Sequence, residues 1–165
     1  MTSFPQYHEI PTQNEYRDIF YLTQHTHTTM GLDQYFYAEP ADEGELAYFR
    51  KANYLHRWVL ATTDEQPESD NCTHIKITLG DLRNLVKQID EILSLRESRK
   101  YKKAKELLDE YNLVPMGGFF FGSTEIDKNF WKELKEDRDT IDGMITQYYD
   151  RDDPDDTSLY YYAWY

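Results

Sequence analysis

The sequence predicts an α+β fold, in which a mostly antiparallel sheet of about four strands is covered by about four helices. Short aromatic or β-branched runs and longer amphipathic patterns follow one another in mixed order, without a regular strand-helix alternation. The chain has 165 residues, 39% hydrophobic and 30% charged, which suits one globular domain. Its 15 tyrosines have a large apolar body and a polar tip, so they suit both cores and interfaces.

Four segments are predicted to be strands, namely 32–38, 73–78, 119–121 and 159–165. The first, Leu32–Ala38, is aromatic and ends before Pro40, and we expect it to be central. In the second, Ile75 and Ile77 alternate with polar residues and should point inward. The run Phe119–Phe121 stands between glycines and predicts a short buried strand. The aromatic C-terminus is expected to pair beside it.

Apolar residues at three- and four-residue spacing predict the helices. Leu46–Ala61 is the first, and the second begins at Thr78 or Asp81 with a clear apolar stripe. Its amphipathic pattern continues to about residue 111, before Pro115 and two glycines. A long helix follows the phenylalanine run, with Thr124 as its predicted cap and Asp127 completing a capping box.

Residues 1–29 are rich in Pro, Gln and Thr, and they predict an N-terminal extension before a single domain at 30–165. His25 and His27 alternate with threonines, as some metal-binding pairs do. A third ligand at a suitable spacing is missing, so a solvated linker is favoured over a metal site. We expect neither a metal nor a cofactor.

The net charge of −13, from 31 acids and 18 bases, argues against non-specific nucleic-acid binding. It permits a surface that competes with nucleic acid for a basic partner, although a soluble acidic protein without that purpose has the same charge. Cys72 is the single cysteine, which excludes an internal disulfide and suits a reducing cytoplasm. The sequence has no membrane-spanning apolar run and no secretory signal, so we expect a cytoplasmic protein.

Several polar residues interrupt apolar patterns. Arg50, Asn53 and His56 lie on or beside the inward face of the first predicted helix, where they must find partners. They form either a buried network that holds the helix to the sheet or the lining of a pocket. Asp33 lies in an apolar strand and could form a structural ion pair with Arg50 or act as a functional acid. The candidate pocket comprises Asp33, Arg50, Asn53, His56, Trp58, Ser123 and Glu125.

Other chemistry has little support. The glycines at 117–122 lack the lysine of a phosphate-binding loop, and helix capping at Ser123–Thr124 is favoured over anion binding. Cys72 and His74 stand two residues apart on a predicted strand, a spacing that seldom gives a tight nucleophile-base pair. The basic segment Arg96–Lys105 is better explained as a solvated helix face than as a phosphate-binding patch. We therefore expect a binding protein rather than an enzyme.

From Met30 onward the chain resembles a family of small, mostly uncharacterised proteins encoded by bacteriophages and prophages. Four motifs carry this resemblance: Met30–Phe36 (MGLDQYF), Tyr48–Trp58 (YFRKANYLHRW), Gly118–Asp127 (GFFFGSTEID) and Tyr160–Trp164 (YYYAW). Phe49 and Ile126 stand where the family pattern has Trp and Tyr, and residues 1–29 precede the usual start.

The resemblance implies a phage context without naming an activity. Small acidic phage proteins often block host defences, so we expect an inhibitor of a host nuclease, of anti-CRISPR or anti-restriction type, that binds through an acidic, aromatic surface. Its partner would be a basic nucleic-acid-binding protein, and the protein itself would not bind nucleic acid or a membrane. The alternative is a small-molecule or nucleotide-binding protein, or an enzyme, that uses the candidate pocket. The expected contact residues are Glu39, Asp42, Glu43, Glu45, Asp64, Glu65, Glu68, Asp70, Asp152, Asp153, Asp155 and Asp156.

Overall fold

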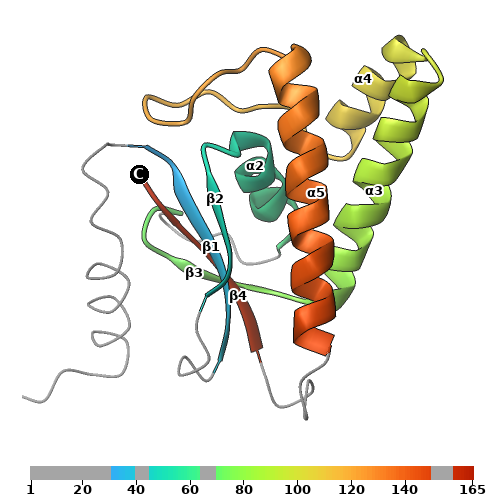
Figure 1. The fold of residues 1–165 in the computed structure, drawn as a ribbon. Helices are drawn as coiled ribbons and strands as arrows, with labels where there is room; N and C mark the ends of the chain where they lie inside the picture. Colours follow the sequence, from blue (N-terminus) through green and yellow to red (C-terminus); the bar gives the residue numbers. More distant parts are fainter. Residues whose placement is uncertain (1–30, 40–44, 64–69, 150–157) are drawn as a thin grey trace, which may run out of the picture.

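A computed structural model of the protein describes residues 31–39, 45–63, 70–149 and 158–165. Within these residues it has one antiparallel sheet of four strands and four helices, which confirms the α+β prediction (Figure 1). The strands are β1 (Asp33–Glu39), β2 (Glu45–Arg50), β3 (His74–Ile77) and β4 (Ser158–Trp164). The helices are α2 (Asn53–Thr62), α3 (Leu79–Glu97), α4 (Tyr101–Glu110) and α5 (Lys128–Tyr149).

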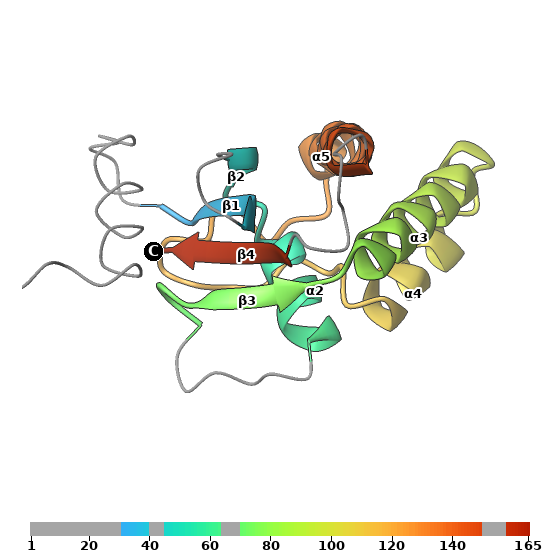
Figure 2. The ribbon, with the colours of Figure 1, turned by 90° about the horizontal axis from the view of Figure 1, so that it is seen from below.

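The strand order is β2-β1-β4-β3, so β1 is central, as predicted, and pairs with both β2 and the C-terminal β4. All four helices lie on one side of this sheet (Figures 1 and 2). The inner face of the sheet therefore supplies the core, with Phe36, Ala38, Ile75 and Tyr161 all buried against the helices. α3 packs between α4 and α5, and α5 also contacts β2.

The opposite side of the sheet carries a second aromatic cluster. Its side chains alternate with the core residues along the strands, because successive residues of a strand point to opposite faces. We call this surface the tyrosine face and define it as Asp33, Tyr35, Tyr37, Tyr48, Arg50, His74, Tyr160 and Tyr162.

The predicted strand at Phe119–Phe121 is wrong, because this segment is an irregular loop. The amide of Phe121 donates to the carbonyl of Gly118 at 3.2 Å, which closes a tight turn. A Cβ atom on Gly118 would lie 2.7 Å from the Phe121 ring, so glycine allows the ring to fold back over the turn. The C-terminal strand, which was expected beside Phe119–Phe121, pairs with β1 and β3 instead.

The predicted helix Leu46–Ala61 is wrong in its first half. Residues 45–50 form strand β2, and the helix begins only at Asn53. Ala47 and Phe49 are buried while their neighbours are more exposed, which is the alternation of a half-buried strand. Lys51 adopts a positive φ of 59° and ends the strand before the helix starts.

Of the other helix boundaries, the start of α3 was predicted, whereas the break between α3 and α4 and the cap of α5 were not. Helix α3 begins after Thr78, one of the two predicted start positions, and Thr78 and Asp81 form a reciprocal capping box there. The pattern that was predicted to run on to residue 111 is broken between α3 and α4, where Arg99 has a φ of 59°. The predicted cap at Thr124 is wrong, because the Asp127 carboxylate accepts the amides of Asn129 and Phe130 and caps α5.

The extension 1–29, with His25 and His27, lies outside the described residues. Among the helices that are described, none combines the length and the apolar character needed to cross a bilayer. The described residues also contain no cluster of three or more side chains suited to holding a metal ion.

Candidate functional site

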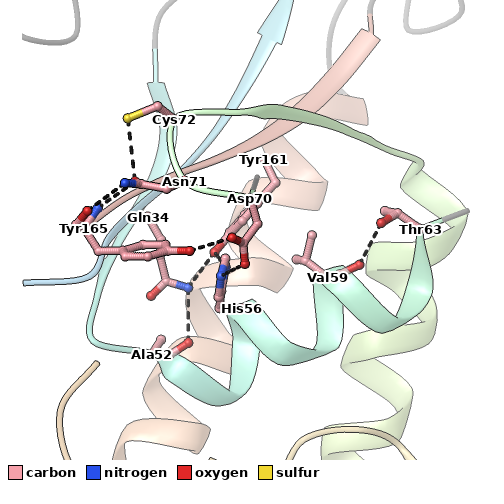
Figure 3. Close-up of polar contacts among 10 residues, drawn as sticks. All are labelled: Gln34, Ala52, His56, Val59, Thr63, Asp70, Asn71, Cys72, Tyr161 and Tyr165. Atoms are coloured by element: carbon pink, nitrogen blue, oxygen red, sulfur yellow. Dashed lines mark hydrogen bonds and ion pairs between the residues drawn. The ribbon is translucent and has the colours of Figure 1, made fainter. Parts of the chain in front are cut away.

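Five polar side chains meet between α2, β1 and the end of β4 (Figure 3). We call them the polar cluster and define it as Gln34, His56, Asp70, Tyr161 and Tyr165. Gln34 and Tyr161 come from the inner face of the sheet, and His56 comes from the first turn of α2. Gln34, His56 and Tyr161 are fully buried, whereas Asp70 and Tyr165 are half-buried.

The hydrogen bonds of the polar cluster form one continuous chain. The Gln34 amide donates to the Ala52 carbonyl at 3.1 Å and to the Tyr161 hydroxyl at 3.0 Å. His56 lies 2.8 Å from that hydroxyl through Nδ1 and 3.0 Å from the Asp70 carboxylate through Nε2. Since a carboxylate only accepts, Nε2 carries the proton, and Nδ1 accepts from Tyr161. Tyr165 donates to the other Asp70 oxygen at 2.6 Å.

The pKa shifts of these side chains agree with the donor and acceptor roles in this chain of hydrogen bonds. Burial lowers the pKa of His56, and the hydrogen bond with Asp70 only partly offsets it, so the imidazole is neutral at pH 7. Partial burial would raise the pKa of Asp70, but hydrogen bonds from Tyr165, the Asp70 backbone and His56 outweigh it and lower that pKa. Burial raises the pKa of Tyr161 well above its usual value. Each hydroxyl and imidazole proton of the cluster therefore has one acceptor.

Asn53 links α2 to the loop that precedes α5. Its side-chain amide donates to the carbonyl of Phe121 at 3.1 Å and to the carbonyl of Ser123 at 2.9 Å. The Phe121 ring is buried and makes edge contacts with His56 and Tyr165 at centroid distances of 5.5 and 4.7 Å. This loop is thus held by the same helix turn that supplies His56 to the polar cluster.

The structure does not bring the candidate pocket residues together. Asp33 lies on the tyrosine face, where it accepts a hydrogen bond from Tyr48 at 2.5 Å and lies 3.9 Å from Arg50, the predicted ion-pair partner. Asn53 and His56 belong to α2, on the helix side of the sheet. Trp58 is buried and donates to Gln88 of α3 at 3.0 Å. Ser123 and Glu125 are exposed, and the Ser123 hydroxyl accepts the Glu125 amide at 3.1 Å.

The expected acidic contact residues fall mostly outside the part of the chain that the structure describes. Glu45 is exposed at the start of β2, and the backbone of Glu39 lies opposite Ser158. Asp70 was expected on an acidic contact loop, and it belongs to the polar cluster instead. The acids outside the described residues are Asp42, Glu43, Asp64, Glu65, Glu68, Asp152, Asp153, Asp155 and Asp156.

One aromatic side chain stands out at the surface. Phe119 is 95% exposed, although its loop is held from several sides. The Leu32 amide donates to the carbonyl of Phe120 at 3.1 Å, and Asn53 binds the two carbonyls that follow at 121 and 123. Gly122 has a φ of +91°, which turns the chain back toward Lys51. We call residues 117–122 the Phe119 loop.

Sequence reasoning missed Gln34, Tyr161 and Tyr165 as members of the polar cluster. The sequence does indicate that Gln34 points inward, because every second residue of a strand lies on the same face and Phe36 and Ala38 face the core. A glutamine at an inward strand position needs buried partners. The partners themselves come from distant segments, and single-sequence patterns do not reveal such pairings.

Comparison of the chain with protein-family models, curated proteins and solved structures found no match.

Proposed function

We propose that this protein inhibits a host defence nuclease, of anti-CRISPR or anti-restriction type, by binding it as a protein partner in the bacterial cytoplasm. The observation that carries the binding role is the Phe119 ring, which is almost fully exposed on a loop held from the protein interior. A large aromatic side chain in this setting loses little conformational entropy on binding and can fill a pocket on a partner.

The charge balance favours a basic partner. The net charge is −13, although the exposed face of α5 mixes Glu133, Glu136 and Asp139 with Lys132 and Lys135. Complementary charge would speed association with a basic nucleic-acid channel and disfavour acidic partners. The nuclease itself is suggested by the resemblance of the four motifs to phage proteins, and direct binding of nucleic acid is disfavoured by the same charge.

The alternative role, a ligand pocket around Asp33, Arg50, Asn53 and His56, has less support. His56 already has partners at both ring nitrogens, and both of the hydrogen bonds from Asn53 Nδ2 go to backbone carbonyls. A ligand at these groups would have to replace existing buried hydrogen bonds, which makes binding costly.

The proposal is tested by producing the protein in bacteria that carry a defined CRISPR or restriction system and measuring the plating efficiency of a sensitive phage. Purified nuclease is then assayed for DNA cleavage with increasing amounts of the protein. We expect restored plating and dose-dependent inhibition that weakens at high salt, since screening reduces the attraction between exposed charges.

Two matched variants connect inhibition to the Phe119 loop. Phe119→Ala should weaken inhibition by at least about tenfold, as expected for an interface hot spot. Tyr101→Ala removes another exposed aromatic ring, from α4, and should change inhibition little. Charge reversal at Asp152, Asp153, Asp155 and Asp156 should also weaken inhibition. Full inhibition by Phe119→Ala, or no inhibition of any tested nuclease by the unmodified protein, would contradict the proposal.

A further inference from the structure

Lys51 is a second exposed residue beside the Phe119 loop, at the junction of β2 and α2. Leu32 joins the two, because its amide donates to the carbonyl of Phe120 at 3.1 Å and its carbonyl accepts the amide of Lys51 at 2.7 Å. The carbonyl of Lys51 in turn accepts the Asn53 amide at 2.8 Å. Both lie at the end of the sheet where β1 begins and β2 ends (Figure 1). The main chain therefore fixes Lys51 relative to the Phe119 loop.

The stem of the Lys51 side chain passes close to two glycines. A Cβ atom on Gly122 would lie 3.2 Å from the Cβ atom and 3.4 Å from the Cδ atom of Lys51. A Cβ atom on Gly31 would lie 3.4 Å from its Cε atom. The stem thus packs against main chain at both of its ends while the residue stays exposed. A side chain that is already ordered in this way loses little entropy when a partner binds it.

The backbone conformation of Lys51 is unusual for a lysine. Its φ of 59° lies in the left-handed region, which is unfavourable for a residue with a Cβ atom and is most often occupied by glycine or asparagine. Glycine would serve the junction of β2 and α2 better, so the turn alone does not explain a lysine here. Strained residues are concentrated at functional sites, where the surrounding structure holds them in place. The amine itself is therefore the candidate for a role.

The ammonium group of Lys51 is an isolated positive charge in an acidic protein. None of the acidic side chains in the described part of the chain forms an ion pair with it. The net charge of −13 attracts a partner from a distance, whereas contacts inside an interface depend on the charges that meet there. A cation beside an exposed aromatic ring fits a negative group beside the pocket that receives the ring.

We propose that Phe119 and Lys51 make a two-point contact, in which the ring fills a pocket of the nuclease and the ammonium group pairs with a carboxylate at the edge of that pocket. This inference rests on the proposed function and names the partner surface of the same site. A nuclease offers both signs of charge, because basic residues bind the nucleic-acid backbone and carboxylates hold the catalytic magnesium. The basic channel attracts the acidic protein as a whole, and Lys51 pairs with an acidic group within it.

The cleavage assay with purified nuclease tests the pairing through matched variants. Lys51→Glu should raise the concentration for half-inhibition by at least about tenfold, since it places like charges opposite each other. Lys51→Arg keeps the positive charge and should stay within about threefold of the unmodified protein. Lys87→Glu, at an exposed position of α3, changes the net charge by the same amount and should have little effect.

Lys51→Gly separates a binding role from a structural one. Glycine adopts the left-handed conformation without strain, so the melting temperature should not fall. The concentration for half-inhibition should nevertheless rise at least about fivefold, because the cation is gone. Full inhibition by Lys51→Gly or by Lys51→Glu would overturn the proposal, as would equal losses for Lys51→Glu and Lys51→Arg.

Carbodiimide cross-linking of the inhibited complex identifies the negative group. The reagent joins an amine to a carboxylate when the two are in contact, so mass spectrometry should find Lys51 linked to an Asp or Glu of the nuclease. The proposal is overturned if other lysines are linked to the nuclease and Lys51 is not, or if Lys51 is linked only to a second copy of this chain. If the unmodified protein inhibits no nuclease, the proposed function fails and this inference fails with it. Inhibition that is insensitive to every change at Lys51 overturns this inference alone.

Discussion

Asn53→Ala should be among the most damaging single substitutions at a polar position. The side-chain amide is buried and donates to the carbonyls of Phe121 and Ser123 at 3.1 and 2.9 Å. Removing it loses two hydrogen bonds, each worth about 1 kcal/mol, and leaves the buried Phe121 carbonyl without this donor, which adds roughly 1–2 kcal/mol. We therefore expect a loss of about 3–4 kcal/mol in the free energy of unfolding.

The loss is measured by urea denaturation, followed by tyrosine and tryptophan fluorescence. Asn84→Ala, at an exposed position of α3, is the matched control and should change the unfolding free energy by less than about 0.5 kcal/mol. Asn53→Asp keeps the size of the side chain but puts acceptors against two carbonyls, so it should destabilise at least as much as Asn53→Ala. A loss below about 0.5 kcal/mol for Asn53→Ala would refute the view that this amide holds the Phe119 loop.

Three further predictions concern charge, capping and the surface. Burial raises the pKa of Asp137 to about 6, above its value in the unfolded chain, so only the folded state stays protonated between about pH 4 and 6. Stability should fall by up to about 3 kcal/mol as pH rises through this range, and Asp137→Asn should remove that slope in urea titrations; an unchanged slope would contradict the assignment. Thr78→Ala breaks the capping box of α3 and should cost about 1 kcal/mol, whereas no measurable loss would show that the cap contributes little. Phe119→Ala should leave the melting temperature unchanged, because the ring is exposed, and a clear drop would mean that it packs within the protein.

The sheet and the main helices could be predicted because their signals are local. The alternation in residues 74–77, the aromatic run of β1 and the apolar stripe of α3 each identify one element within a few residues. The C-terminal strand was also predicted, because a run of aromatic residues is seldom left free in water.

The predictions were wrong where a strand pattern runs into a helix pattern, and where tertiary contacts determine the local structure. Strand β2 and helix α2 are separated only by Lys51 and Ala52, so their apolar residues combine into a false helical pattern over 46–61. The phenylalanine run was misread because three adjacent aromatics suggest a buried strand. Only Phe121 is buried, since the turn from Gly118 directs Phe119 to the surface.

The candidate pocket has little support from the structure for a related reason. Sequence patterns show that Asn53 and His56 face inward, and a pocket and a closed hydrogen-bond network predict that pattern equally well. A pocket leaves some buried donors and acceptors without protein partners, whereas a closed network does not. Here the partners are Gln34, Asp70 and Tyr161, which lie in three different segments of the chain.

The polar cluster has a consequence for how the surface loop is held. An apolar core tolerates small slips between a helix and a sheet, whereas a directed chain of hydrogen bonds does not, because each donor must meet its own acceptor. The chain from Gln34 through Tyr161 and His56 to Asp70 therefore fixes the first turn of α2 relative to β1 and β4. Asn53 lies in that same turn, and its hydrogen bonds hold the carbonyls on either side of Gly122 at a fixed position relative to the turn. The buried polar residues thus limit the positions that the Phe119 ring can occupy.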